Sequence, residues 1–159
     1  MEDRPEIVAL RDAAAVAAAA ARRVADAAAE AVRERGRFVL VLSGGRTPLD
    51  TYGRLASSGE TAIVPWNRTI VLFGDERCVG PNHGDSNFHM ADEALLRRVS
   101  IPRDSVHRIE GEDPDPARAA ARYEAVLRSL FPHESAPPSD LVLLGVGADG
   151  HTASLFPGS

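Results

Sequence analysis

A carboxylate and an imidazole stand two residues apart near the end of the chain, at Asp149 and His151. The loop around them contains Gly145, Gly147 and Gly150, and glycine lets a backbone turn sharply and approach a ligand closely. An imidazole in its ordinary state titrates near neutral pH, which suits a general base. These residues therefore predict a site in which His151 takes up a proton.

Three charged residues follow one another at Asp75, Glu76 and Arg77. Arg77 has the chemistry to polarise a carbonyl or bind an anion. A salt-bridged surface loop fits the same run of charges. Its position directly after an apolar run favours the functional interpretation, because ligands of open α/β sheets bind at the carboxyl ends of strands.

A third loop suits an anion. It runs through Ser43, Gly44, Gly45, Arg46 and Thr47, just before a strong helix start. Backbone N–H groups and the helix dipole attract anions at such a position, and the arginine and the two hydroxyls add donors. A tight turn with an exposed arginine fits these residues equally well, so phosphate binding is one of two interpretations.

Each of these loops follows an apolar run that predicts a buried strand, at residues 38–42, 69–73 and 141–144. The carboxyl ends of parallel strands meet at one edge of a sheet. We therefore expect the three loops to converge on a single pocket.

Helical patterns separate the strands. We predict four helices and two weaker strands, the helices at 13–35, 47–57, 87–99 and 116–130 and the strands at 7–10 and 106–109. Asp12, Thr47 and Ser86 are placed to cap helix N-termini. The alternation of strand and helix predicts one α/β domain over residues 1–159, with a three-layer architecture of a parallel sheet and helices on both faces.

Composition narrows the possible functions. The chain has 159 residues, a net charge of −5, one cysteine and no lysine. The missing lysine excludes Schiff-base chemistry and a P-loop lysine within the chain, and the negative charge argues against nucleic acid as a partner. The sequence offers no apolar run of 18 residues and no signal segment, so we expect no membrane partner and a cytoplasmic location.

Two cofactor interpretations are weak. Two histidines and two aspartates follow no established metal-binding spacing, and we interpret them as solvated surface residues: His83, Asp85, His89 and Asp92. Residues 145–150 match the dinucleotide fingerprint G-x-G-x-x-G. Asp149 would place a negative charge beside the pyrophosphate, and no second strand follows to supply an acid for the ribose. We expect neither a metal nor a dinucleotide.

Three stretches together resemble the 6-phosphogluconolactonase family. They are Leu-Ser-Gly-Gly-Arg-Thr-Pro at 42–48, Phe-Gly-Asp-Glu-Arg-Cys-Val at 73–79 with Asp-Ser-Asn at 85–87, and Gly-Val-Gly-Ala-Asp-Gly-His-Thr-Ala-Ser-Leu-Phe-Pro-Gly at 145–158. The resemblance implies the fold of sugar-phosphate isomerases and CoA transferases. It also implies hydrolysis of 6-phospho-D-glucono-1,5-lactone to 6-phospho-D-gluconate in the oxidative pentose phosphate pathway, without a metal or another cofactor.

Glucosamine-6-phosphate deaminases resemble the chain less well. Their pattern has Asp-Glu-Tyr where this chain has Asp-Glu-Arg at 75–77, and Ile-Ala-Phe-Asn-Glu-Pro where this chain has Thr-Ala-Ser-Leu-Phe-Pro at 152–157. The glutamate that serves ring opening in the deaminases is therefore absent. A non-catalytic sugar-phosphate-binding module of the same fold is a further alternative, which would need neither His151 nor Arg77.

The resemblance implies a mechanism. His151 removes a proton from water, and Arg77 with N–H groups around Gly147 to Gly150 stabilises the oxyanion. Asp75 or Asp149 orients the imidazole or the sugar hydroxyls, and the loop at 43–47 orients the anionic end of the substrate. We also place Thr152 beside the substrate.

The family normally continues well past residue 159. We therefore expect a domain truncated at its C-terminus and weakly active or inactive alone. Its expected partner is the small sugar-phosphate lactone, and its expected assembly is a monomer or a weak homo-oligomer.

Overall fold

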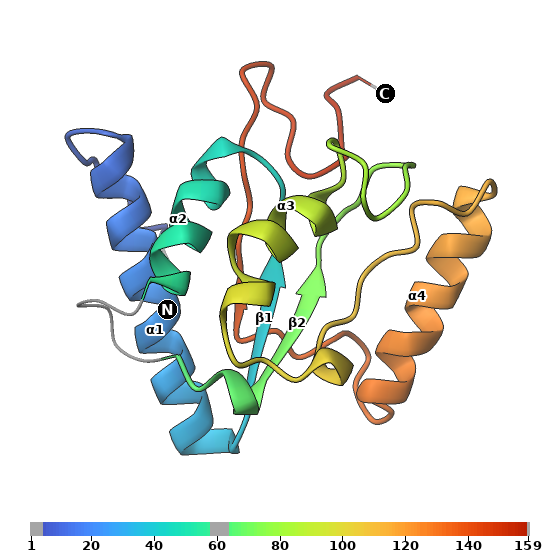
Figure 1. The fold of residues 1–159 in the computed structure, drawn as a ribbon, viewed down its shortest axis with the longest axis horizontal. Coiled ribbons are helices and arrows are strands. Elements are labelled where there is room, and N and C mark those ends of the chain that lie inside the picture. The colour runs from blue at the N-terminus through green and yellow to red at the C-terminus, as the bar shows by residue number, and fades with distance from the viewer. Residues whose placement is uncertain (1–4, 58–63, 159) are drawn as a thin grey trace.

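The computed structural model describes residues 5–57 and 64–158 as a parallel sheet between two layers of helices (Figure 1). The strand order is β2-β1-β3, and the strands are β1 (Phe38–Leu42), β2 (Thr69–Phe73) and β3 (Leu141–Val142). The helices are α1 (Ala13–Arg35), α2 (Arg46–Ala56), α3 (Asn87–Ala94) and α4 (Pro116–Leu130). Within these ranges, no helix is both long and apolar enough to cross a lipid bilayer.

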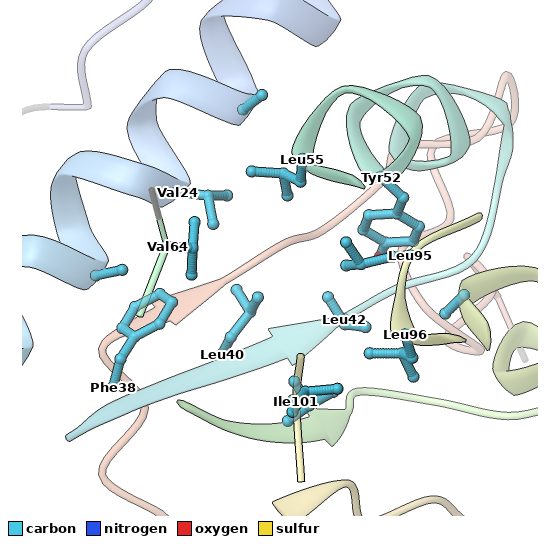
Figure 2. Close-up of a cluster of buried hydrophobic side chains, with 14 of the residues drawn as sticks. Val24, Phe38, Leu40, Leu42, Tyr52, Leu55, Val64, Leu95, Leu96 and Ile101 are labelled. Carbon is cyan, nitrogen blue, oxygen red and sulfur yellow. The ribbon is translucent and has the colours of Figure 1, made fainter. Parts of the chain in front are cut away.

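The two faces of the sheet are covered unequally. On one face, Leu40 of β1 packs in a large apolar cluster with side chains such as Val24 of α1, Tyr52 of α2 and Leu95 beyond α3 (Figure 2). On the other face, Val39 and Leu72 pack with Phe131 at the end of α4. Successive residues of a strand point to opposite faces, so β1 is apolar throughout because both of its faces are covered. The predicted three-layer α/β architecture is confirmed.

Local end signals predict most helix boundaries. Asp12 caps α1 by accepting from the N–H of Ala15 at 2.7 Å, and Gly36 ends that helix with a left-handed φ of 72°. Ser86 caps α3 as expected. The expected cap at Thr47 is wrong, because α2 begins one residue earlier, and Gly45 stands at the cap position with a φ of 109°.

The weaker strand predictions fail where tertiary pairing is missing. Residues 7–10 form no strand, and Ile7 is 91% exposed. The expected strand at 106–109 is reduced to one parallel bridge between Val106 and Val71. The helix predicted over 87–99 ends at Ala94 and continues only as a 3-10 turn at Leu96–Arg98.

The last predicted strand is shorter and more exposed than its apolar sequence indicates. Only Leu141 and Val142 pair with β1, and Leu144 is 61% exposed. Apolar composition predicted burial on both faces, but β3 lies at the edge of the sheet. Asp140 sets its register, since its carboxylate accepts from the Val39 N–H and from Arg35, each at 2.7 Å.

Two tyrosines bind the backbone where the central strands end. The Tyr52 hydroxyl donates to the Ser43 carbonyl at 2.8 Å and accepts from the Ser43 N–H at 3.1 Å. The Tyr123 hydroxyl makes the same pair of bonds to Phe73, at 3.1 and 2.9 Å. Burial raises the pKa of both phenols, so both hydroxyls stay protonated as donors. The starting points of the first two loops are thereby bound to helices on opposite faces.

The segment between the 3-10 turn at Arg103–Ser105 and α4, residues 106–113, carries a network of charged side chains. Arg108 binds Glu112 through two nitrogens, at 2.6 and 2.8 Å, and its guanidinium lies 5.8 Å from the centre of the Phe88 ring. Asp113 is almost fully buried and pairs with Arg118 and Arg122 of α4. We call residues 106–113 the connector.

Replacing Glu112 with glutamine should reduce stability in a pH-dependent way. The hydrogen bond from Arg108 lowers the pKa of Glu112 from 4.5 to about 2, so its stabilising effect is present above pH 4.5 and is lost as the pH falls toward 2. Because the side chain is 40% exposed, we expect a loss of less than about 1 kcal/mol in the free energy of unfolding at pH 7. Urea unfolding of both proteins from pH 7 to pH 3 measures the difference, which should narrow at the acidic end.

A matched control tests the cause. In an Arg108→Gln background, the same glutamate substitution should have little effect at either pH. A difference between wild type and Glu112→Gln that stays constant across this range would show that the Arg108 hydrogen bond does not contribute.

Candidate active site

The loops after the three strands converge on one cleft, as their strand ends predict. In Figure 1 the loop after β2 and the C-terminal loop lie at the end of the sheet toward which β1 and β2 point. The cleft has a volume of about 220 Å³. Its lining comes from all three loops and from the start of α3: Ser43, Gly44, Gly45, Asp75, Arg77, Asn87, Gly145, Val146, Gly147, His151 and Ala153.

The first loop brings backbone donors to the cleft. Within the described residues, the N–H groups of Gly44 and Gly45 donate no hydrogen bond, and both precede the first turn of α2. The Ser43 hydroxyl is buried and has no hydrogen-bond partner there either. Unsatisfied donors at a helix N-terminus suit an anionic ligand.

Two other residues expected in this loop lie outside the cleft. Arg46 and Thr47 belong to the first turn of α2, are exposed, and are absent from the cleft lining. The Thr47 carbonyl accepts from the hydroxyl of Thr51. The structure therefore brings together Ser43, Gly44 and Gly45 of the predicted anion loop, and leaves these two beside it.

The second loop brings Asp75 and Arg77 to the same cleft. Asp75 accepts a hydrogen bond from the Ser154 hydroxyl at 2.7 Å, so it contacts the third loop directly. Arg77 is exposed and forms no ion pair with any described residue. Its guanidinium is therefore free of a neutralising carboxylate and can face an anionic or developing negative charge.

Glu76, unlike Asp75 and Arg77, is occupied by hydrogen bonds to nearby backbone and hydroxyl groups. Its carboxylate accepts from the N–H groups of Arg77, Asn87 and Phe88 at 2.7, 2.7 and 2.9 Å, and from the Ser86 hydroxyl at 3.0 Å. The three bonds from Ser86, Asn87 and Phe88 bind the second loop to the N-terminus of α3, where a negative charge is also favoured by the helix dipole. The oxygens of Glu76 are occupied by these contacts, so the residue supports the second loop of the cleft.

Sequence reasoning missed Asn87 as part of the site. Its amide nitrogen donates to the Asp75 carbonyl at 3.0 Å, and its side-chain oxygen lies against Gly44. A Cβ atom at Gly44 would lie 2.0 Å from that oxygen, so any side chain at residue 44 would displace the Asn87 amide from this position. The Asp-Ser-Asn stretch at 85–87 was part of the family resemblance and could have pointed to Asn87. Its partners, Asp75 and Gly44, are distant in the sequence and could not be predicted from it.

The third loop pairs its imidazole with Asp149. The Nδ1 atom of His151 lies 2.5 Å from Asp149 Oδ1, and this hydrogen bond lowers the pKa of Asp149. An ionised carboxylate only accepts, so Nδ1 is the protonated nitrogen and Nε2 is left as the acceptor. Of the two aspartates expected to orient the imidazole, Asp149 contacts it and Asp75 binds Ser154 instead.

Two glycines of this loop permit close packing and a left-handed turn. A Cβ atom at Gly147 would lie 2.2 Å from the His151 ring, and Gly150 has a left-handed φ of 88°. The N–H groups of both glycines are already used within the loop, donating to the carbonyls of His151 and Gly147. In this conformation, these two N–H groups are therefore engaged within the loop and are not free to face an oxyanion. Thr152 lies outside the cleft, since its hydroxyl donates to the Gly145 carbonyl.

The four residues considered for a metal are dispersed among other contacts. The N–H of Asp85 donates to Nδ1 of His83 at 3.1 Å, whereas Asp92 pairs with Arg97 and Arg103. Across residues 5–57 and 64–158, no group of three His, Cys, Asp or Glu side chains is placed to hold a metal ion.

Comparison with known protein families shows to which family the chain belongs. A family model described as glucosamine-6-phosphate isomerases/6-phosphogluconolactonase matches residues 11–159. The chain belongs to this family. The matched range contains all three loops of the cleft and every strand of the sheet.

Relatives within the family share much of the sequence. A 6-phosphogluconolactonase of Nostoc sp. is 46% identical over 130 residues, which cover 80% of this chain and 52% of the relative. A 6-phosphogluconolactonase of Treponema pallidum is 42% identical over 119 residues, covering 74% and 48%. The chain thus spans about half the length of the curated relatives it matches.

Solved structures of the family share the fold. The 6-phosphogluconolactonase of Trypanosoma brucei superposes with a TM-score of 0.84 at 32% identity, over 98% of this chain and 65% of that one. A monomeric glucosamine-6-phosphate deaminase gives a TM-score of 0.73 at 24% identity, over 90% and 56%. The second likeness concerns the fold alone.

Proposed function

We propose that the cleft hydrolyses 6-phospho-D-glucono-1,5-lactone to 6-phospho-D-gluconate, the reaction for which the relatives are named. The observation that carries the proposal is the Asp149–His151 pair, whose imidazole lines the cleft together with Arg77. A base and a cation in one cleft are what hydrolysis of a lactone requires. The assignment of the catalytic and substrate-binding residues is part of this proposal.

The anionic end of the substrate binds at the first loop. The N–H groups of Gly44 and Gly45 and the hydroxyl of Ser43 are unsatisfied donors beside the N-terminus of α2. Together they can replace part of the hydration of a phosphate or a sugar hydroxyl. Arg46, the first residue of α2, adds positive charge near this position without lining the cleft.

The chemical step follows from the tautomer of His151. Its Nε2 takes a proton from water as the water oxygen bonds to the lactone carbonyl carbon. Arg77 stabilises the negative charge that develops on the carbonyl oxygen, and Asp149 stabilises the imidazolium. The bond from that carbon to the ring oxygen then breaks, and the imidazolium gives its proton to the ring oxygen. The product is the open-chain acid, and no step calls for a cofactor.

Deamination of glucosamine 6-phosphate is disfavoured by one residue. Where the deaminase pattern has the ring-opening glutamate, this chain has Phe156, whose ring centre lies 4.8 Å from that of His151. An aromatic ring cannot accept or deliver the proton that ring opening needs. The ring instead covers one side of the imidazole, which favours lactone hydrolysis over deamination.

A direct assay tests the proposal. The full-length protein should accelerate lactone hydrolysis well above the spontaneous rate and release no ammonia from glucosamine 6-phosphate. Ammonia release without lactonase activity would replace the proposal by the deaminase alternative. Saturable binding of the sugar phosphate with neither activity would leave the binding-module alternative.

The setting of the reaction is proposed from the sequence. We place the protein in the cytoplasm, acting on a free sugar-phosphate lactone as a monomer or a weak homo-oligomer. Light scattering across a range of protein concentrations tests the proposed assembly state. A molar mass of a higher oligomer that does not fall on dilution would contradict it.

A further inference from the structure

Gly111 of the connector lies directly against the backbone that carries Arg77. A Cβ atom at Gly111 would lie 2.1 Å from the Arg77 carbonyl oxygen, 2.9 Å from the Val79 carbonyl oxygen and 3.2 Å from Cγ of Glu76. The two closest atoms belong to the backbone, so no change of rotamer can relieve the clash. The φ of Gly111 lies outside the left-handed region, so the requirement for glycine comes from space and not from backbone conformation.

The connector is bound to the sheet and to α4. The His107 N–H donates to the Val71 carbonyl at 2.9 Å, which extends the sheet by one bridge. Ion pairs bind the rest of the connector to itself and to α4: Arg108 with Glu112, Glu110 with Arg122, and Asp113 with Arg118 and Arg122. An added methyl group at Gly111 would therefore press on the second loop more readily than it would move the connector.

The Arg77 segment is held on its other side by α3. Glu76 accepts three hydrogen bonds there, from Ser86, Asn87 and Phe88 at the start of that helix. The Arg77 side chain itself has no ion pair among the described residues. The described contacts that place Arg77 are therefore those of its backbone, which lies between α3 and the connector.

We propose that Gly111 is a positioning residue of the active site, which acts by fixing the backbone of Arg77. The proposal rests on the proposed function for its kinetic consequence, since Arg77 is expected to stabilise the oxyanion. If Gly111 positions Arg77, the connector and α4 influence the catalytic rate although they lie outside the cleft. A shift of about 1 Å in a catalytic group can lower a rate by about 10²-fold.

The test is a double-mutant cycle on the full-length protein. Gly111→Ala should lower kcat for lactone hydrolysis by about 10- to 10²-fold. In an Arg77→Ala background, the same substitution should change kcat by less than about twofold, because the residue through which it acts is gone. Gly80→Ala is the matched control, since a Cβ atom there meets nothing within 4 Å, and it should leave kcat unchanged within about twofold.

Two kinetic results would overturn the proposal. One is an equal loss of kcat from Gly111→Ala with and without Arg77, which a general disturbance of the fold would cause. The other is an effect of Gly111→Ala no larger than that of Gly80→Ala. If Gly111→Ala does not fold, Ser86→Ala replaces it, because that change removes one of the four bonds to Glu76 and should show the same dependence on Arg77.

A measurement without catalysis separates this proposal from the proposed function. The amide NMR signal of Arg77 should shift in Gly111→Ala and stay in place in Gly80→Ala, whichever reaction the protein catalyses. An Arg77 signal that does not move in Gly111→Ala would remove the positioning role. Absence of lactonase activity in the wild-type protein, with that shift present, would contradict only the proposed function.

Discussion

Replacing His151 with alanine is expected to lower kcat for lactone hydrolysis by about 10²-fold or more, with KM largely kept. The imidazole is the group in the cleft that is poised to take a proton, because Asp149 fixes Nδ1 as the donor and leaves Nε2 to accept. Binding should persist because the first loop and Arg77 are untouched. Steady-state kinetics, corrected for spontaneous hydrolysis, measure both constants.

The control for this substitution is His133→Ala. His133 lies in the exposed turn after α4 and outside the cleft, so its loss should leave kcat unchanged. Near-normal turnover in His151→Ala would remove His151 from the mechanism. A large rise in KM with kcat kept would assign His151 to substrate binding instead.

Replacing Gly147 with alanine is expected to lower kcat by about 10²-fold while the fold is kept. The new methyl group would lie 2.2 Å from the Cε1 and Nδ1 atoms of His151 and 2.8 Å from Asp149 Oδ1. These atoms belong to side chains that are partly exposed, so the ring can move away at small cost in stability. Its displacement would break the pairing that orients Nε2.

Gly80→Ala is the matched control, because Gly80 lies outside the cleft lining. A Cβ atom at Gly80 meets nothing within 4 Å, so kcat should change by less than about twofold. The imidazole signals of His151 in NMR spectra should shift in the Gly147 variant and not in the Gly80 variant. Wild-type kcat in Gly147→Ala would contradict the placement of the ring.

Elements with strong local signals were predicted to the residue. The strands at 38–42 and 69–73 and the helices at 13–35 and 116–130 are observed with those bounds. In each case the apolar run or the cap is complete within the element, so little depends on distant residues. Whether an apolar strand lies in the centre or at the edge of a sheet depends on its neighbours in space, which its own residues do not specify. For this reason the apolar run at 141–144 predicted a buried strand, although β3 lies at the edge.

The candidate site divides in the same way. Convergence of the three loops followed from the parallel strands alone. The sequence left open whether Asp75 or Asp149 orients His151, and the structure pairs the imidazole with Asp149. The contacts of Glu76, Asn87 and Gly111 could not be predicted, since each joins segments that are 10 to 43 residues apart. The same holds for hydrogen bonds that the N–H groups of the last loop make to its own carbonyls, which only the folded loop reveals.

The central claim is that the three strand-end loops form one binding site for a single sugar phosphate. Titration of the ¹⁵N-labelled protein with 6-phospho-D-gluconate, followed by amide chemical shifts, tests it most directly. The account predicts that the signals of Gly44, Arg77 and Gly147 shift together and saturate with one common Kd. Saturable shifts that leave one of these loops unchanged, or that gather away from the cleft, would contradict it.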